Sequence, residues 1–135
     1  YKPDMYLEIR FLAHVQAIEG YQRLRPQKLH EGNALKCRLM DLFDSLPSNL
    51  QQEIHPTFIT FRDDVVNTRD YYTHYIPQRA DQRMNRLEIL DACNRLRIFM
   101  TILLLREIGI DDSIVLEAIQ RLKEHILPRL LEQNP

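Results

Sequence analysis

The sequence has few of the residues on which disulfide-rich, metal-clustered or membrane-spanning proteins depend. Its 135 residues include 2 cysteines, 3 glycines and no tryptophan. Cys37 and Cys93 have no second cysteine or histidine at metal-ligand spacing, which argues against a metal site and favours a reducing, cytoplasmic setting. The longest nearly apolar run, residues 98–105, is far shorter than the ~20 residues of a membrane-spanning helix, so no membrane association is expected.

Neither sign of charge dominates the chain. The 18 Lys and Arg residues oppose 19 Asp and Glu residues, giving a formal net charge of −1, so a nucleic acid would have to bind a local basic patch. The basic residues are 14 Arg and 4 Lys, which suits contacts of fixed geometry with phosphate or carboxylate. With 44% hydrophobic residues, the length suits one compact domain. Because the chain opens at Tyr1 without an initiator Met, we expect residues 1–135 to be one domain of a longer protein.

Apolar residues recur at helical spacing along most of the chain, and no stretch has the alternation typical of a strand. The predicted helices are Met5 to about Leu24 with Asp4 as N-cap, a second from after Pro26 to Ser45 with a short turn opened by Pro47, a third over 57–75, a fourth from near Asp81 to Ile108 ended by Gly109, and a last one capped by residues 111–113 and kinked or ended by Pro128. The sequence therefore predicts an all-α fold, an antiparallel bundle of about five helices.

The third predicted helix has the most informative pattern. At about 100° per residue, Phe61, Val65 and Tyr72 fall within about 60° of Phe58 and form a buried line. Arg69 falls at about 20°, inside the same sector. Because an unpaired buried guanidinium is costly, we expect Arg69 to meet an anion or a partner surface.

A polar stripe follows the other side of this helix, at Asp63, Asn67, Asp70 and His74. Asp70 and His74 are i, i+4 neighbours, so the carboxylate is expected to accept a hydrogen bond from the imidazole and to fix its tautomer. Histidine is the side chain best suited to general acid–base catalysis near neutral pH. The stripe therefore predicts a proton-transfer group at the end of the helix.

Residues 69–74, Arg-Asp-Tyr-Tyr-Thr-His, resemble the Arg-x4-His motif of HEPN domains, in which the arginine is commonly followed by Asn, Asp or His. The wider run 66–75 is similar to the Apea-like HEPN group. The segment 17–21, Ala-Ile-Glu-Gly-Tyr, and the long apolar helix after the motif also fit, so the resemblance covers most of the chain.

The resemblance implies a helical domain that dimerises, so that two copies of the motif form one composite site for RNA cleavage without metal or cofactor. In that site His74 would transfer protons, Arg69 would clamp the phosphate, and Asp70 would orient His74 or the arginine pair. The attacking ribose 2′-OH would restrict cleavage to RNA. Tyr71 and Tyr75 are candidates for stacking on unpaired bases, and Arg79 for extending a phosphate track.

We therefore expect a cytoplasmic endoribonuclease of a defence or toxin-type system. Its expected partners are RNA, a second copy of the chain, and a fused sensor domain or regulatory partner. Two alternatives stay open: a HEPN-like domain that binds RNA or nucleotides without cleavage, and a helical protein-interaction module. Asp70 stands where the group typically has Asn, and its added negative charge beside a phosphate site bears on the rate of cleavage more than on the fold.

Overall fold

The computed structural model describes the backbone of residues 3–74 and 76–132 and the side chains of residues 6–74 and 76–125. Within these ranges the chain is helical and has no strand. The elements in order are α1 Pro3–Leu24, α2 Leu35–Asp44, α3 Ser48–Ile54, α4 Phe58–His74, the 3-10 helix η1 Pro77–Gln82, α5 Arg86–Glu107 and α6 Asp112–Glu132. The predicted all-α bundle is confirmed.

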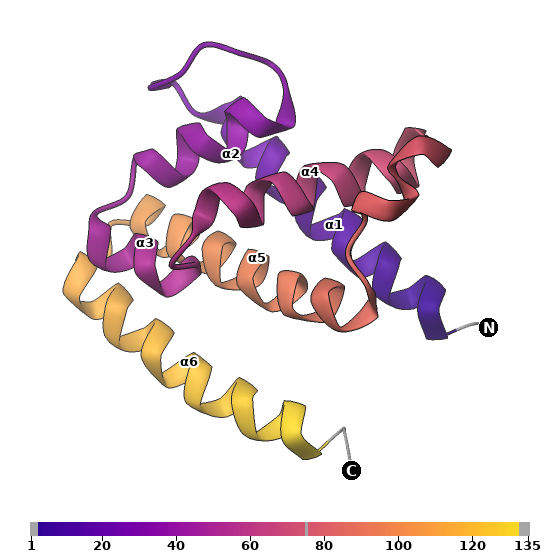
Figure 1. Ribbon diagram of the computed structural model, residues 1–135. Helices are drawn as coiled ribbons and strands as arrows, with labels where there is room; N and C mark the ends of the chain where they lie inside the picture. Colours follow the sequence, from indigo (N-terminus) through magenta and orange to yellow (C-terminus); the bar gives the residue numbers. More distant parts are fainter. Residues whose placement is uncertain (1–2, 75, 133–135) are drawn as a thin grey trace.

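The core forms around α5, which Figure 1 shows in the middle of the bundle. α5 packs most extensively against α1, and also contacts α3 and α6. Its residues Leu96, Phe99 and Ile102 are fully buried. The Phe99 ring meets the Phe58 ring edge to face at 5.7 Å between centroids, which joins the start of α4 to the core.

The expected start of the second helix is wrong, because residues 25–34 form an irregular segment and α2 begins only at Leu35. The Asp41 carboxylate accepts hydrogen bonds from the backbone N–H groups of Leu29 and His30, which holds this segment against α2. Gly32 adopts a φ of 152°, which is not a helical conformation. A carboxylate ten residues further along therefore satisfies backbone donors that a helix would otherwise have used.

The start of the fourth predicted helix also needs correction. Residues 77–82 form the separate 3-10 helix η1, and α5 begins at Arg86 after a capping box. In that box Asn85 accepts the backbone N–H of Glu88, while the Glu88 side chain accepts the N–H of Asn85. The cap at Asn85 therefore sets the start of α5, and Asp81 belongs to η1.

The end of α5 agrees with the sequence: Gly109 has a φ of 87°, the left-handed conformation that ends helices. α6 follows at Asp112 and continues through Pro128 to Glu132, so Pro128 does not end it. Proline fixes φ near the helical value and removes only one backbone donor, which the helix accommodates here. No helix within the described backbone has the length and apolar character needed to cross a bilayer.

Candidate active site

α4 carries the predicted motif and is anchored by the apolar line read from its sequence. Phe58 and Phe61 are each 5% exposed, Val65 is fully buried, and Tyr72 is partly buried against the core. The helix ends at His74, and Pro77 then opens η1, which contacts α4. The buried line thus fixes the rotation of α4 and places the motif at its last turn (Figure 1).

Arg69 meets anions, as its position in the apolar sector predicted. Its guanidinium lies between Glu19 of α1, with 4.0 Å between Nη2 and Oε1, and Asp70, with 3.3 Å between Nε and Oδ1. The side chain is 21% exposed. The buried Nε makes no hydrogen bond with the described residues, because the approach of Asp70 is poorly aligned. Arg69 is therefore charge-compensated, but its hydrogen-bonding capacity is not filled.

Asp70 does not hold His74, which corrects the expected i, i+4 contact. The Asp70 Oδ2 atom accepts a hydrogen bond from Arg79 Nη1 at 2.8 Å, and the same nitrogen lies 3.4 Å from Asn67 Oδ1. Because Pro77 turns the chain back onto α4, Arg79 reaches over the polar stripe from η1. Its cationic donors form charge-assisted hydrogen bonds there, which are stronger than bonds to a neutral imidazole.

His74 is exposed at the last turn of α4 and makes no hydrogen bond or ion pair with the residues whose side chains are described. Five residues separate it from Arg69, so the two side chains leave the helix about 140° apart and about 7.5 Å apart along its axis. Nothing within one chain brings the imidazole and the guanidinium to a common point. A site that uses both groups on one phosphate needs a second copy of α4.

The tyrosines beside the motif differ in environment. Tyr71 lies under the guanidinium of Arg83, whose central carbon is 4.7 Å from the ring centroid. The Tyr71 ring also meets the Tyr72 ring edge to face at 5.1 Å. Tyr72 lines a cavity between α1, α4 and α5. Tyr75, the other candidate for base stacking, lies outside the described residues.

Thr68 is a positioning residue that sequence reasoning missed. It is fully buried, and its Oγ1 accepts the backbone N–H of Met84 at 2.9 Å. This bond ties the segment between η1 and α5 to the centre of α4, directly beside Arg69. The only signal in the sequence is a hydroxyl near the border of the apolar line, which does not reveal a partner sixteen residues away.

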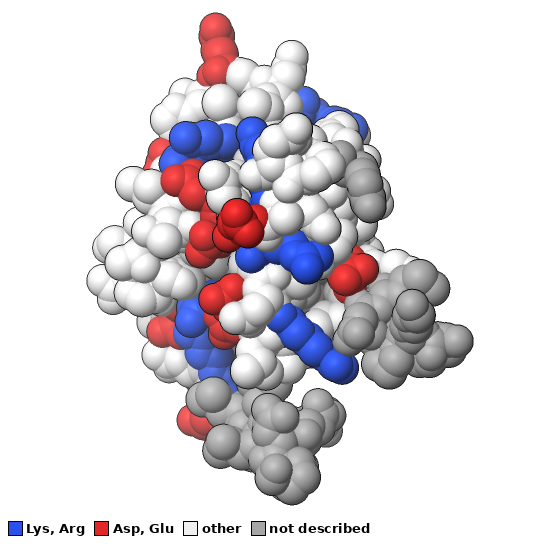
Figure 2. Space-filling view, turned by 45° about the vertical axis from the view of Figure 1, so that its right-hand side comes forward, with Lys and Arg blue, Asp and Glu red and all other residues white. Residues whose placement is uncertain are grey.

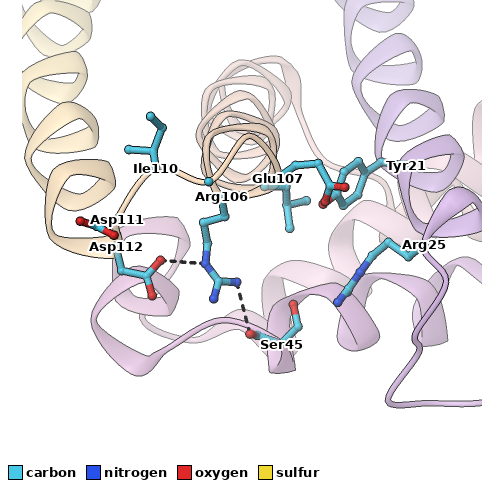
Figure 3. Close-up of a pocket in the computed structure, with 10 residues that line it drawn as sticks. Tyr21, Arg25, Ser45, Arg106, Glu107, Ile110, Asp111 and Asp112 are labelled. Carbon is cyan, nitrogen blue, oxygen red and sulfur yellow. Dashed lines mark hydrogen bonds and ion pairs between the residues drawn. The ribbon is translucent and has the colours of Figure 1, made fainter.

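A second cavity of about 420 Å³ lies at the other end of α5 (Figure 3). Tyr21 donates a hydrogen bond to Glu107 at 2.8 Å, and burial together with this bond raises the pKa of Tyr21 to about 12. Arg106 donates to Asp112 at 2.8 Å through Nε. Two of the polar side chains that line the cavity are thus engaged in bonds between helices, and sequence reasoning did not point to it.

Basic and acidic side chains intermingle on the face shown in Figure 2. That view brings forward the side of the molecule where α4 ends, and no large area of one sign appears on it. This agrees with the formal net charge of −1. Attraction of a polyanion to this face would depend on individual arginines and not on a broad positive field.

The comparisons with known proteins support the family read from the motif. The family profile described as Apea-like HEPN matches residues 12–114, a range that starts in α1, contains all of α4 and ends in α6. Comparison with curated proteins gives no significant match, and neither does comparison with solved structures. HEPN domains are helical bundles, often of ribonucleases. The matched range covers more than half of the sequence and includes Arg69 and His74, so the chain belongs to the Apea-like HEPN family, a family related to nucleases and RNA.

Proposed function

We propose that this protein is a metal-independent endoribonuclease whose active site forms where the α4 ends of two copies meet. The observation that carries the proposal is the divergence of Arg69 and His74 at the end of one helix. Each lies at the last turns of α4, and a two-fold partner supplies the group that points the other way. The biological role that fits such an enzyme is the effector of a defence or toxin-type system.

The proposed reaction is attack of a ribose 2′-oxygen on the adjacent phosphorus, with cleavage of the bond from phosphorus to the 5′-oxygen. One His74 accepts the 2′-OH proton, and His74 of the second copy gives a proton to the leaving 5′-oxygen. The products are a 2′,3′-cyclic phosphate and a 5′-hydroxyl. Since DNA lacks the 2′-OH, only RNA is a substrate.

Arg69 stabilises the extra negative charge of the pentacoordinate phosphorus in this proposal. Glu19 lies 4.0 Å from the guanidinium without a hydrogen bond, so an incoming phosphate can replace that contact. Asp70 acts as a positioning residue: it holds Arg69 on one side and Arg79 on the other. Tyr71 and Arg79 lie beside the motif and are proposed to contact the flanking nucleotides.

The first test is cleavage of single-stranded RNA in EDTA by the wild-type protein, His74→Ala and Arg69→Ala. Each substitution is expected to reduce cleavage about 100-fold or more. His125→Ala and Arg121→Ala, at exposed positions of α6, serve as matched controls and are expected to cleave normally. Equal activity in all five proteins would overturn the assignment of the site, and RNA binding without cleavage by the wild type would favour a non-catalytic HEPN-like domain.

The second test asks whether the site is shared between copies. His74→Ala and Arg69→Ala chains are co-expressed with different tags, and the mixed dimer is purified on both. If Arg69 of one copy acts with His74 of the other, the mixed dimer regains cleavage that neither single variant has. A mixed dimer as inactive as its parents would overturn the composite arrangement.

A further inference from the structure

A cavity of about 510 Å³ opens beside the motif, between α1, the end of α4 and the start of α5. Its volume falls within the roughly 300–1,000 Å³ typical of small-molecule sites. Leu7, Met84 and Ile89 form its apolar wall and are at most 9% exposed. A flat apolar group can therefore enter between the helices and remain partly shielded from water.

Three polar side chains line the same cavity: Glu8, Tyr72 and Arg83. Burial raises the pKa of Tyr72, and so does the neighbouring Glu8 carboxylate, which accepts a hydrogen bond from the phenol. Arg83 is held in place by its stacking on Tyr71. The cavity thus combines an acceptor-only carboxylate, a donor-only guanidinium and an aromatic ring.

We propose that this cavity binds a guanine base of the RNA substrate, with Glu8 as the residue that selects it. The inference rests on the proposed ribonuclease function and adds its base preference. Guanine presents two adjacent donors, N1–H and the N2 amino group, which match the two oxygens of one carboxylate. Its O6 and N7 acceptors match an arginine, the commonest guanine contact. The Tyr72 ring supplies an aromatic surface for the base.

The other bases match this set less well. Adenine places the N1 acceptor next to its single amino group, so a carboxylate would face one donor and one repelling lone pair. Uracil has one N–H between two carbonyl oxygens, and cytosine has one amino group beside an acceptor. Only guanine offers two neighbouring donors to Glu8, and the difference in matched hydrogen bonds gives the cavity its preference.

The cavity is also suitably placed relative to the phosphate site. Tyr72 follows Arg69 by three residues, which puts it about 60° around α4 and about 4.5 Å further along the axis. The two side chains therefore lie on the same side of the helix. A guanosine bound at Tyr72 would bring its own phosphates toward Arg69, so cleavage is expected next to guanosine.

The binding test uses the His74→Ala protein, so that substrate stays intact, and measures the fluorescence anisotropy of labelled oligouridine with one central guanosine. Inosine lacks only the N2 amino group, and replacing guanosine with inosine or adenosine is expected to weaken binding about 10-fold. Adding Glu8→Gln should remove this preference while binding of plain oligouridine stays unchanged. Glu124→Gln, at an exposed position of α6, is the matched control and should keep it.

Equal affinity for the guanosine, inosine and adenosine strands would overturn the inference, as would a preference that survives Glu8→Gln. Guanosine monophosphate alone is tested as a competitor. If it binds in a Glu8-dependent way but the guanosine strand does not displace it, the ligand is a free nucleotide and the assignment to RNA is wrong. A wild type that binds guanosine strands selectively but cleaves none would overturn the proposed function alone.

Discussion

The carboxylate of Asp70 is bonded to Arg79, with 2.8 Å between Oδ2 and Nη1. Its other oxygen lies 3.3 Å from Arg69 Nε, so one carboxylate connects the motif arginine to η1. This connection leaves His74 without a partner among the described side chains and makes the position of Arg69 depend on a residue ten positions further along the chain.

Substitution of Arg79 is therefore expected to affect activity more than stability. Arg79→Gln should lower the free energy of unfolding by less than about 1 kcal/mol, because the pair is partly exposed to solvent. Cleavage should fall about 10-fold or more, since Arg69 loses the group that fixes Asp70. Chemical denaturation and single-turnover cleavage give the two numbers. Arg121→Gln breaks an exposed pair in α6 and should change neither. A matching loss of activity in both variants would contradict the prediction.

Thr68 should be a stability determinant because of its hydroxyl. In Thr68→Val the backbone N–H of Met84 loses its acceptor in a buried place, which is expected to cost about 1–3 kcal/mol of unfolding free energy. Thr68→Ser keeps the oxygen and should lose less. Urea denaturation measures both variants. A valine variant as stable as the serine variant would show that the hydrogen bond contributes nothing.

Asp41 is the buried carboxylate on which the segment 25–34 depends. Burial alone would raise its pKa, but hydrogen bonds from the His30 N–H, Gln22 and the Leu29 N–H lower the pKa below its ordinary value. We expect Asp41→Asn to reduce the free energy of unfolding by about 3 kcal/mol, because Arg25 then loses its counter-ion.

The contribution of ionised Asp41 is present above its ordinary pKa of about 4 and is lost as the pH falls through its lowered value. Urea denaturation across this acid range should show the loss in the wild type and not in Asp41→Asn. Asp44→Asn is the control, because this neighbouring carboxylate is 38% exposed. If the two variants lose equal stability, the burial of Asp41 is not what matters.

Two histidines should make the fold sensitive to mild acid. Burial lowers the pKa of His55 and of His14, and nearby arginines lower both further. The unfolded chain then binds more protons than the folded one below about pH 6.5, so stability is full above that pH and falls below it. His55 Nδ1 also accepts the Thr57 N–H, a bond that requires an unprotonated nitrogen.

Thermal unfolding from pH 8 to pH 5 tests this dependence. His55→Asn keeps an acceptor near Thr57 and removes the titration, so its melting temperature should fall less on acidification than that of the wild type. His125→Asn, at an exposed position, should follow the wild type. A steeper fall in His55→Asn would reverse the sign of the argument and exclude His55 as the cause.

The helices with clear periodicity could be predicted from the sequence because their causes are local. The spacing of Phe58, Phe61 and Val65 gives the buried face of α4, and the prolines on either side give its approximate ends. Boundaries set by distant groups could not be predicted in this way. The start of α2 depends on Asp41 satisfying backbone donors, and that contact is not visible in a local pattern.

The sequence by itself determined the helical class, the rotation of α4 and the family, since these depend on residue spacing along one element. Only the tertiary structure decided which charges meet: Glu19 approaches Arg69 from α1, and Arg79 takes Asp70 from η1. The cavity lined by Glu8 and Tyr72 likewise joins residues 64 positions apart. Such pairings follow from how helices pack, and helix packing is fixed by the whole core and not by any one segment.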